Sequence, residues 1–143
     1  MIAANYRMLI DKVAPAVCAC VVKADAYGLG LEPVARRLWR EGCRVFFVAS
    51  LEEGIGLRGI LAQAEIIPLN GLLPGEEPHY REYRLFPTLN DLGQLAHWSA
   101  YCASHGNTPA VLHVDTGMSR LGLSVMERTH LQATLDSAVL AGA

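Results

Sequence analysis

Residues 16–49 have the sequence AVCACVVKADAYGLGLEPVARRLWREGCRVFFVA, in which two kinds of pattern alternate. Residues 16–22 and 45–49 are short continuous apolar runs rich in valine, as is typical of strands buried on both faces. Between them, residues 31–41 carry apolar side chains at helical spacing, and Gly42 follows as a helix stop. Strand, helix and strand in this order predict a parallel β/α unit.

The same alternation continues to the end of the chain. Three further strands are predicted, at residues 65–69, 84–86 and 110–114. Helices are predicted after Ser50, where Glu53 can complete a capping box, over 74–82, from a cap at Asn90 to about 104, and over about 126–140. Five units fill 143 residues, and eight would need roughly 230, the scale of a closed barrel. We therefore expect an α/β fold: a partial (β/α)8 TIM-type barrel with about five of eight β/α units, or a complete five-stranded doubly wound sheet.

The composition restricts the function classes. Hydrophobic residues make up 52% and charged residues 18%, and the mean hydropathy is +0.24. Such a chain is too apolar to be intrinsically disordered, and its apolar surplus fits a chain whose partner surface is missing. Twelve basic and fourteen acidic residues give a net charge of -2, so there is no basic field for nucleic acid.

A membrane span, an export signal and a metal site are also not expected. The longest apolar run, residues 13–22, is well short of the ~20 residues of a membrane span. It could form the core of a signal peptide, but Asp11 and Lys23 flank it, and a buried strand is favoured. The histidines do not have metal-ligand spacing. No C-x-x-C pair occurs, so we expect a cytoplasmic protein with reduced thiols at Cys18, Cys20, Cys43 and Cys102.

The first candidate site follows the first predicted strand, in the segment KADAYGLG at residues 23–30. Lys23 stands at the carboxyl end of that strand, the edge where α/β folds bind ligands. Its apolar neighbours would partly desolvate the amine and favour Schiff-base chemistry. Tyr27 is near enough in sequence to hydrogen-bond the same ligand. The alternative is a solvated lysine at a strand end, followed by a glycine turn.

The second candidate site is the segment HVDTGMSRLG at residues 113–122, which follows the fifth predicted strand. It therefore opens onto the same edge as Lys23. The planar guanidinium of Arg120 can hold a carboxylate or a phenolate oxygen. The alternative is that Asp115 and Thr116 only shape the loop and that Arg120 is a surface charge.

A third pattern, GIGLRG at residues 54–59, matches the dinucleotide fingerprint G-x-G-x-x-G. That fingerprint needs its glycines in a turn directly between strand and helix. Here residues 50–53 intervene and form the first turn of the predicted helix, so the glycines would fall inside it. We expect no dinucleotide site.

Two of these segments together resemble one family. VVKADAYGLG at residues 21–30 and VDTGMSRLGL at 114–123 are similar to the two N-terminal signatures of alanine racemase, a fold-type-III enzyme that uses pyridoxal 5'-phosphate. Residues 5–7 and 50–54 add support. The family is built on a (β/α)8 barrel followed by a β domain. The resemblance implies that residues 1–143 are the N-terminal part of the cofactor-binding barrel, with the later barrel units and the β domain absent.

The resemblance also assigns roles. Lys23 would hold the cofactor as a Schiff base and act as one of two bases for the α-proton, Tyr27 would hydrogen-bond the cofactor phosphate, and Arg120 would contact the phenolic oxygen and the substrate carboxylate. The implied activity is the interconversion of L- and D-alanine, which supplies D-alanine for peptidoglycan in the cytoplasm. The implied assembly is a homodimer, because the second base comes from the partner subunit's C-terminal domain.

The sequence departs from the family pattern at His113, and two other functions compete with this interpretation. His113 stands where many members have a carbamylated lysine that pairs with the active-site arginine; it can still orient Arg120, or another anion fills the gap. The rivals are a racemase of broader specificity, for serine as an example, and a non-catalytic cofactor-binding module. Because the second base would be missing from residues 1–143, we expect this piece alone to be inactive.

Overall fold

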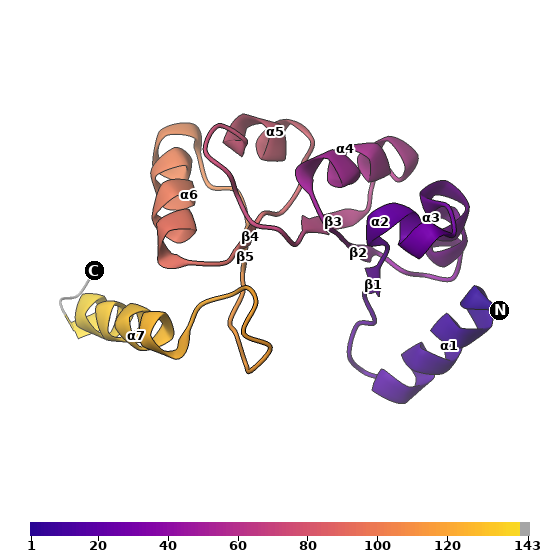
Figure 1. The fold of residues 1–143 in the computed structure, drawn as a ribbon, viewed down its shortest axis with the longest axis horizontal. Coiled ribbons are helices and arrows are strands. Elements are labelled where there is room, and N and C mark those ends of the chain that lie inside the picture. Colours follow the sequence, from indigo (N-terminus) through magenta and orange to yellow (C-terminus); the bar gives the residue numbers. More distant parts are fainter. Residues whose placement is uncertain (141–143) are drawn as a thin grey trace.

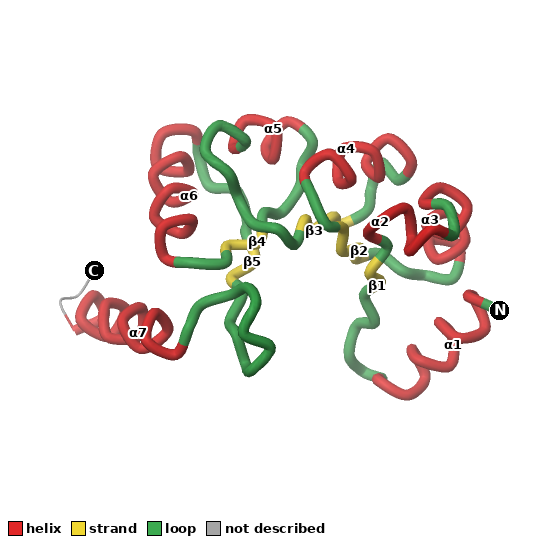
Figure 2. Tube along the Cα trace, in the orientation of Figure 1, coloured by secondary structure: helices red, strands yellow, loops and turns green. Residues whose placement is uncertain are grey.

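The computed structural model describes the backbone of residues 1–140 and the side chains of residues 1–135. Short strands alternate with helices along the chain (Figure 2). The elements are α1 (Ile2–Val13), β1 (Cys20–Val21), α2 (Lys23–Gly28), α3 (Leu31–Arg40), β2 (Val45–Val48), α4 (Leu51–Ile60), β3 (Glu65–Pro68), α5 (Glu77–Glu82), β4 (Thr88–Leu89), α6 (Leu92–His105), β5 (Val111–Leu112) and α7 (Val125–Leu140). The predicted α/β class is confirmed.

All strand pairs are parallel. One sheet has the order β1-β2-β3, with Cys20 opposite Phe46 and Phe46 opposite Ile66, and a second sheet pairs β4 with β5. Between the two sheets, the Phe86 N–H donates to the Ile66 carbonyl at 3.0 Å. The regular ladder does not continue there because Pro68 and Pro87 have no N–H to donate.

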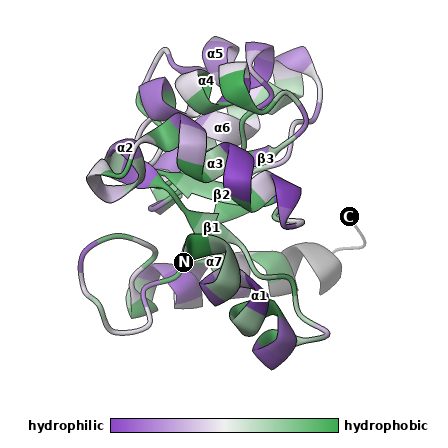
Figure 3. Ribbon diagram, turned by 90° about the vertical axis from the view of Figure 1, so that its right-hand side faces the viewer, coloured by the Kyte–Doolittle hydropathy of each residue, from purple (hydrophilic) through white to green (hydrophobic). Residues whose placement is uncertain are grey.

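The strands follow an arc, with α3, α4, α5 and α6 on its outer side (Figure 1). The helices α1 and α7 lie at opposite ends of the arc. A doubly wound sheet carries helices on both faces, so this one-sided arrangement favours the barrel-type fold. The strands β1 and β2 are hydrophobic where they lie beneath the helices (Figure 3).

The core lies between the strands and the outer helices. Phe46, Ile66, Leu57 and Tyr80 are fully buried. Burying an aliphatic or phenylalanine side chain stabilises a fold by about 1.5–3 kcal/mol. Helix α4 approaches β3 closely at Gly54, where an added Cβ would lie 3.3 Å from a side-chain carbon of Pro68. The glycines of residues 54–59 thus lie inside a helix, as the sequence predicted.

The predicted first strand, residues 16–22, was too long. The strand covers only Cys20–Val21, with one further hydrogen bond from the Val22 N–H to the Phe47 carbonyl at 2.9 Å, and Val17 is 78% exposed. In the observed register, residues before 19 would lie opposite the turn that ends α3 rather than opposite β2, which begins at Val45. An apolar run therefore forms a strand only over those residues that have a partner in the neighbouring strand.

The predicted fourth strand, residues 84–86, was misplaced, and the next helix cap was assigned one residue early. Arg84 has a φ of 51° and belongs to the exit from α5, where the Leu85 N–H donates to the Tyr80 carbonyl at 2.8 Å. The strand forms at Thr88–Leu89 instead. The helix cap is Asp91, whose carboxylate accepts from the Gln94 N–H at 2.8 Å.

Within the described residues, no helix has the length and apolar character required to cross a membrane.

Candidate active site

The carboxyl ends of the parallel strands carry polar residues on a common edge. Lys23 follows β1, Asn70 follows β3, Asn90 follows β4 and His113 follows β5. A pocket of about 380 Å³ opens there, lined by Lys23, Leu69, Asn70, His113, Met118, Arg120 and Leu121. The structure thus brings together Lys23 and Arg120, the two predicted catalytic residues, although they lie near opposite ends of the chain.

Lys23 begins α2, which is a left-handed turn rather than an ordinary helix. Ala24, Asp25, Ala26 and Tyr27 have φ values of 51°, 52°, 53° and 57°. For residues other than glycine this conformation costs about 1–2 kcal/mol each. Strain of this kind persists only where the surroundings impose it, and it is concentrated at functional sites.

Hydrogen bonds at both ends of the turn impose its shape. The Ala26 N–H donates to the Val22 carbonyl at 3.0 Å, and the Gly30 N–H to the Asp25 carbonyl at 3.0 Å. The Asp25 carboxylate also accepts from the Leu31 N–H at 2.6 Å. The Lys23 amine itself has no hydrogen-bond or ion-pair partner within the described part of the chain, so it is available to a ligand.

Glu53 fixes the turn from the neighbouring unit. One carboxylate oxygen accepts from the Ala24 N–H at 2.8 Å and the other from the Ala49 N–H at 2.7 Å. The sequence identified Glu53 only as half of a capping box with Ser50. That box is half formed: the Ser50 hydroxyl accepts from the Glu53 N–H at 3.4 Å. The clamp on the residue after Lys23 was missed because it depends on tertiary contact.

Asp115 shapes the loop that carries Arg120. One of its carboxylate oxygens accepts from the Gly117 N–H at 2.9 Å and from the Ser119 N–H at 3.0 Å. These two bonds lower the pKa of the Asp115 carboxyl below its usual value. The Arg120 side chain lines the pocket and has no hydrogen-bond or ion-pair partner among the described residues. Asp115 therefore shapes the loop, as the alternative interpretation predicted, and Arg120 lines the same pocket as Lys23.

His113 is held by Asn90, which the sequence had only suggested as a helix cap. A nitrogen of the His113 ring, Nδ1, lies 2.8 Å from the Asn90 amide oxygen. The Asn90 side-chain amide donates to the Leu69 carbonyl at 3.1 Å, across the gap between the two sheets. Asn90 is 6% exposed. A polar residue placed directly after a buried strand was the available indication of this role.

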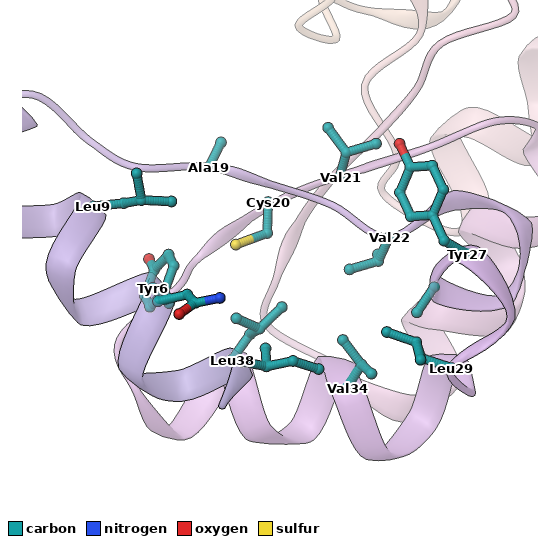
Figure 4. Close-up of a pocket in the computed structure, with 13 residues that line it drawn as sticks. Tyr6, Leu9, Ala19, Cys20, Val21, Val22, Tyr27, Leu29, Val34 and Leu38 are labelled. Carbon is teal, nitrogen blue, oxygen red and sulfur yellow. The ribbon is translucent and has the colours of Figure 1, made fainter.

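Tyr27 lies away from this pocket. It is 64% exposed and lines a separate apolar groove of about 340 Å³ between α1, β1 and α3 (Figure 4). Figure 4 shows its ring beside Val21 and Val22, at the end of the groove remote from Tyr6. The contact between Tyr27 and a cofactor phosphate thus stays a prediction.

The fold and the pocket define a barrel-type α/β protein with a candidate ligand site at the carboxyl edge of its strands. This site is lined by a lysine and an arginine that are unpaired among the described residues. A family profile described as "Alanine racemase, N-terminal domain" matches residues 1–140. The chain belongs to this family.

Individual relatives agree. The chain is 51% identical over 86% of its length to the alanine racemase of Methylobacterium sp. (strain 4-46), and 52% identical over 92% to the catabolic alanine racemase of Rhizobium johnstonii. The crystal structure of alanine racemase from Bartonella henselae, with covalently bound pyridoxal phosphate, superposes with a TM-score of 0.87 at 42% identity over 91% of this chain. The chain spans 34%, 35% and 38% of these three proteins.

Proposed function

We propose that this chain forms the N-terminal five of eight units of the barrel of a pyridoxal-phosphate-dependent alanine racemase, which interconverts L- and D-alanine. The names of its relatives and their greater length support this proposal. The rest of the barrel and a β domain would come from the part of the enzyme that corresponds to the remaining length of the relatives. In this proposal the enzyme is a cytoplasmic homodimer that supplies D-alanine for peptidoglycan.

The residues of the pocket fit the cofactor. A Schiff base needs an amine that no carboxylate holds, and the Lys23 amine is unpaired within the described part of the chain. The cofactor and the substrate both present anionic oxygens, and the unpaired guanidinium of Arg120 lines the same pocket. Lys23 would hold the cofactor and Arg120 would contact its phenolic oxygen. Tyr27 lines the neighbouring groove rather than this pocket, and its contact with the cofactor phosphate rests on the family resemblance alone. When bound, the cofactor supplies an electron sink that makes the substrate α-proton acidic.

The remaining steps belong to the protein's own groups. Once the substrate amine has replaced Lys23 on the cofactor, the released Nζ amine would accept or return the α-proton on one face of the substrate carbon. Arg120 orients the substrate carboxylate through its planar pair of N–H donors. Inversion needs a second base on the opposite face, which the partner subunit of the homodimer would supply.

One observation supports the proposal most: Lys23 and Arg120, from β/α units at opposite ends of the chain, line the same pocket. The test is to purify the full-length protein that carries this chain, reduce it with borohydride in the presence of pyridoxal phosphate, and map the labelled peptides. Borohydride converts an imine into a stable amine, so the pyridoxyl group should be found on Lys23. Lys12, the other lysine of this chain, is the internal control.

A Lys23→Arg variant should lose both the label and the conversion of L-alanine to D-alanine. Labelling of Lys12 in place of Lys23, or racemisation that survives Lys23→Arg, would refute the proposal.

A further inference from the structure

Two cysteine side chains meet in the core layer between the strands and the helices, and neither of them lines the pocket of Lys23. Cys20 lies opposite Phe46 in the parallel ladder, so the two side chains share a face of the sheet, and Phe46 is fully buried there. Cys43 comes two residues before β2 and is also fully buried, and its N–H donates to the Leu38 carbonyl at 3.1 Å. In this layer the sulfur of Cys20 contacts the sulfur of Cys43.

Hydrogen bonds give the two thiols different properties. The Cys43 thiol donates to the Val45 carbonyl, with 3.3 Å between sulfur and oxygen, so its proton is used on the backbone. The Cys20 thiol is then the donor in the contact between the two sulfurs, and Cys43 is the acceptor. This contact lowers the pKa of the Cys43 thiol to about 7 and raises the pKa of the Cys20 thiol. When the pair loses a proton, the negative charge is therefore held mainly on Cys43, and the thiolate is the nucleophilic form of a cysteine.

Cys20 is the member of the pair that a small oxidant can reach. It lines the apolar groove of about 340 Å³ between α1, β1 and α3, whereas Cys43 does not. Figure 4 shows the Cys20 sulfur directed toward Tyr6 in this groove. The Tyr6 hydroxyl donates to the Cys18 carbonyl at 3.0 Å, which fixes the backbone just before Cys20. The pair thus combines an accessible sulfur with a buried sulfur that holds the charge.

Oxidation suits this pair better than metal binding does. A structural zinc site needs four ligands. Among the residues that the structure describes, no three histidine, cysteine, aspartate or glutamate side chains are grouped so that they could hold a metal ion. Two sulfurs in contact can instead be oxidised together, because the sulfenic acid that forms on one thiol condenses with the other.

We propose that Cys20 and Cys43 are a redox-sensitive pair, which hydrogen peroxide converts into a disulfide between β1 and the segment that leads into β2. The Cys20 sulfur attacks one peroxide oxygen, the O–O bond breaks, and the other oxygen leaves as water with the thiol proton. The Cys43 sulfur then attacks the sulfur of the resulting sulfenic acid, the S–O bond breaks, and a second water leaves with the remaining thiol proton. The two sulfurs lose two electrons and peroxide gains them. This inference is independent of the proposed function, in which neither sulfur takes part.

Peptide mapping of the full-length protein tests the pairing. The protein is treated with hydrogen peroxide, denatured in N-ethylmaleimide to block the remaining thiols, and digested with trypsin without reduction. Trypsin releases residues 13–23 and residues 41–44 as separate peptides, so the disulfide should join these two peptides until dithiothreitol is added. We expect this pairing to exceed every other pairing among Cys18, Cys20, Cys43 and Cys102 by about tenfold or more, because the two sulfurs already lie together. Blocked thiols on both Cys20 and Cys43 after peroxide treatment would overturn the inference.

Matched variants distinguish Cys20 from Cys18, which lies in the same tryptic peptide. Both residues are only partly buried, so serine at either position leaves the core filled. Cys20→Ser should abolish the joined peptides, whereas Cys18→Ser should retain them. The opposite result would overturn the inference. When the parent protein is oxidised in urea, the preference for one pairing should disappear, and an unchanged preference there would show that the native contact is not its cause.

The unfolding transition provides a second measurement. The disulfide would close residues 20–43 into a loop, and such a loop restricts the unfolded chain. If the folded protein already holds the two sulfurs together, oxidation should raise the urea concentration at the midpoint of unfolding, and dithiothreitol should reverse the shift. A lower midpoint after oxidation would overturn the inference, because it would show that the native fold must be distorted to form the bond.

Discussion

Gly122 offers a sharp test of how the loop and the histidine are held. Its φ is +101°, and a Cβ at this position would lie 2.9 Å from the Asp115 nitrogen as well as against the His113 ring. The loop cannot simply retreat, because the adjacent Leu123 N–H donates to the His113 carbonyl at 2.8 Å and the Asp115 N–H donates to the Leu123 carbonyl at 3.0 Å. Gly122→Ala should therefore displace the His113 ring.

The expected cost has two parts. A left-handed backbone costs a residue with a side chain about 1–2 kcal/mol. Displacing the ring breaks its hydrogen bond to Asn90, which is 6% exposed, and a buried amide oxygen without a partner costs about 1–3 kcal/mol. The sum is roughly 2–5 kcal/mol. Gly117→Ala is the matched control, because Gly117 has a φ of +131° in the same loop but nothing within 4 Å of the added Cβ. It should incur only the first part.

Urea unfolding of the full-length protein measures both variants against the parent. We expect Gly122→Ala to lose at least about 1 kcal/mol more of the free energy of unfolding than Gly117→Ala. The NMR spectrum of His113 should change in the Gly122 variant alone. Equal losses in the two variants, with an unchanged His113 resonance, would show that Gly122 is required only for its backbone conformation and that the ring is free to move.

Two further pairs of variants test the scaffold. Glu53→Gln should destabilise the protein by about 1–3 kcal/mol and slow pyridoxal labelling of Lys23, because an amide oxygen can accept from only one of the two backbone N–H groups that Glu53 now holds. The control is Glu52→Gln, at the exposed neighbouring residue, which should change the free energy of unfolding by no more than about 0.5 kcal/mol. Equal behaviour of the two variants would contradict the role of Glu53 in holding the turn. In α4, Gly56→Ala should stabilise by up to about 1 kcal/mol because its Cβ meets nothing, whereas Gly54→Ala should lose that gain against Leu85 and Pro68, at 3.0 and 3.3 Å. Thermal melts would show the order, and a Gly54 variant as stable as the Gly56 variant would refute the close packing.

The sequence predicted the units of the fold well where an apolar run pairs with a strand on each side. The run at Val45–Val48 pairs with strands on both sides, and the prediction missed its end by one residue. The helix Leu31–Arg40 ends where Gly42 predicted a stop. The fourth strand was misplaced because its position depends on two other properties. These are how α5 ends and which carbonyls the N–H groups around Pro87 can reach. Neither property is visible in local hydrophobicity.

The site was predictable to a similar degree. Strand ends placed Lys23, His113 and Arg120 on one edge, and the structure puts all three around one pocket. Asn90 and Glu53 were missed as site residues because their partners, the Leu69 carbonyl and the Ala24 N–H, are distant in sequence. Such contacts depend on how neighbouring units pack, which a single sequence does not specify.

The two loops that carry the site's cations are fixed in the same way, and this explains why the cations stay available. Glu53 uses its carboxylate on the backbone N–H of Ala24, next to Lys23, and on that of Ala49, and Asp115 uses its carboxylate on two backbone N–H groups of the loop that carries Arg120. Each carboxylate is engaged with the backbone and stabilises the loop, and neither forms an ion pair with Lys23 or Arg120 within the described residues. Within the described chain, Lys23 and Arg120 are accordingly left without anionic partners in a shared pocket. An anionic ligand can bind both of them without first breaking a salt bridge, so the same hydrogen bonds that stabilise the loops also keep the site ready to bind.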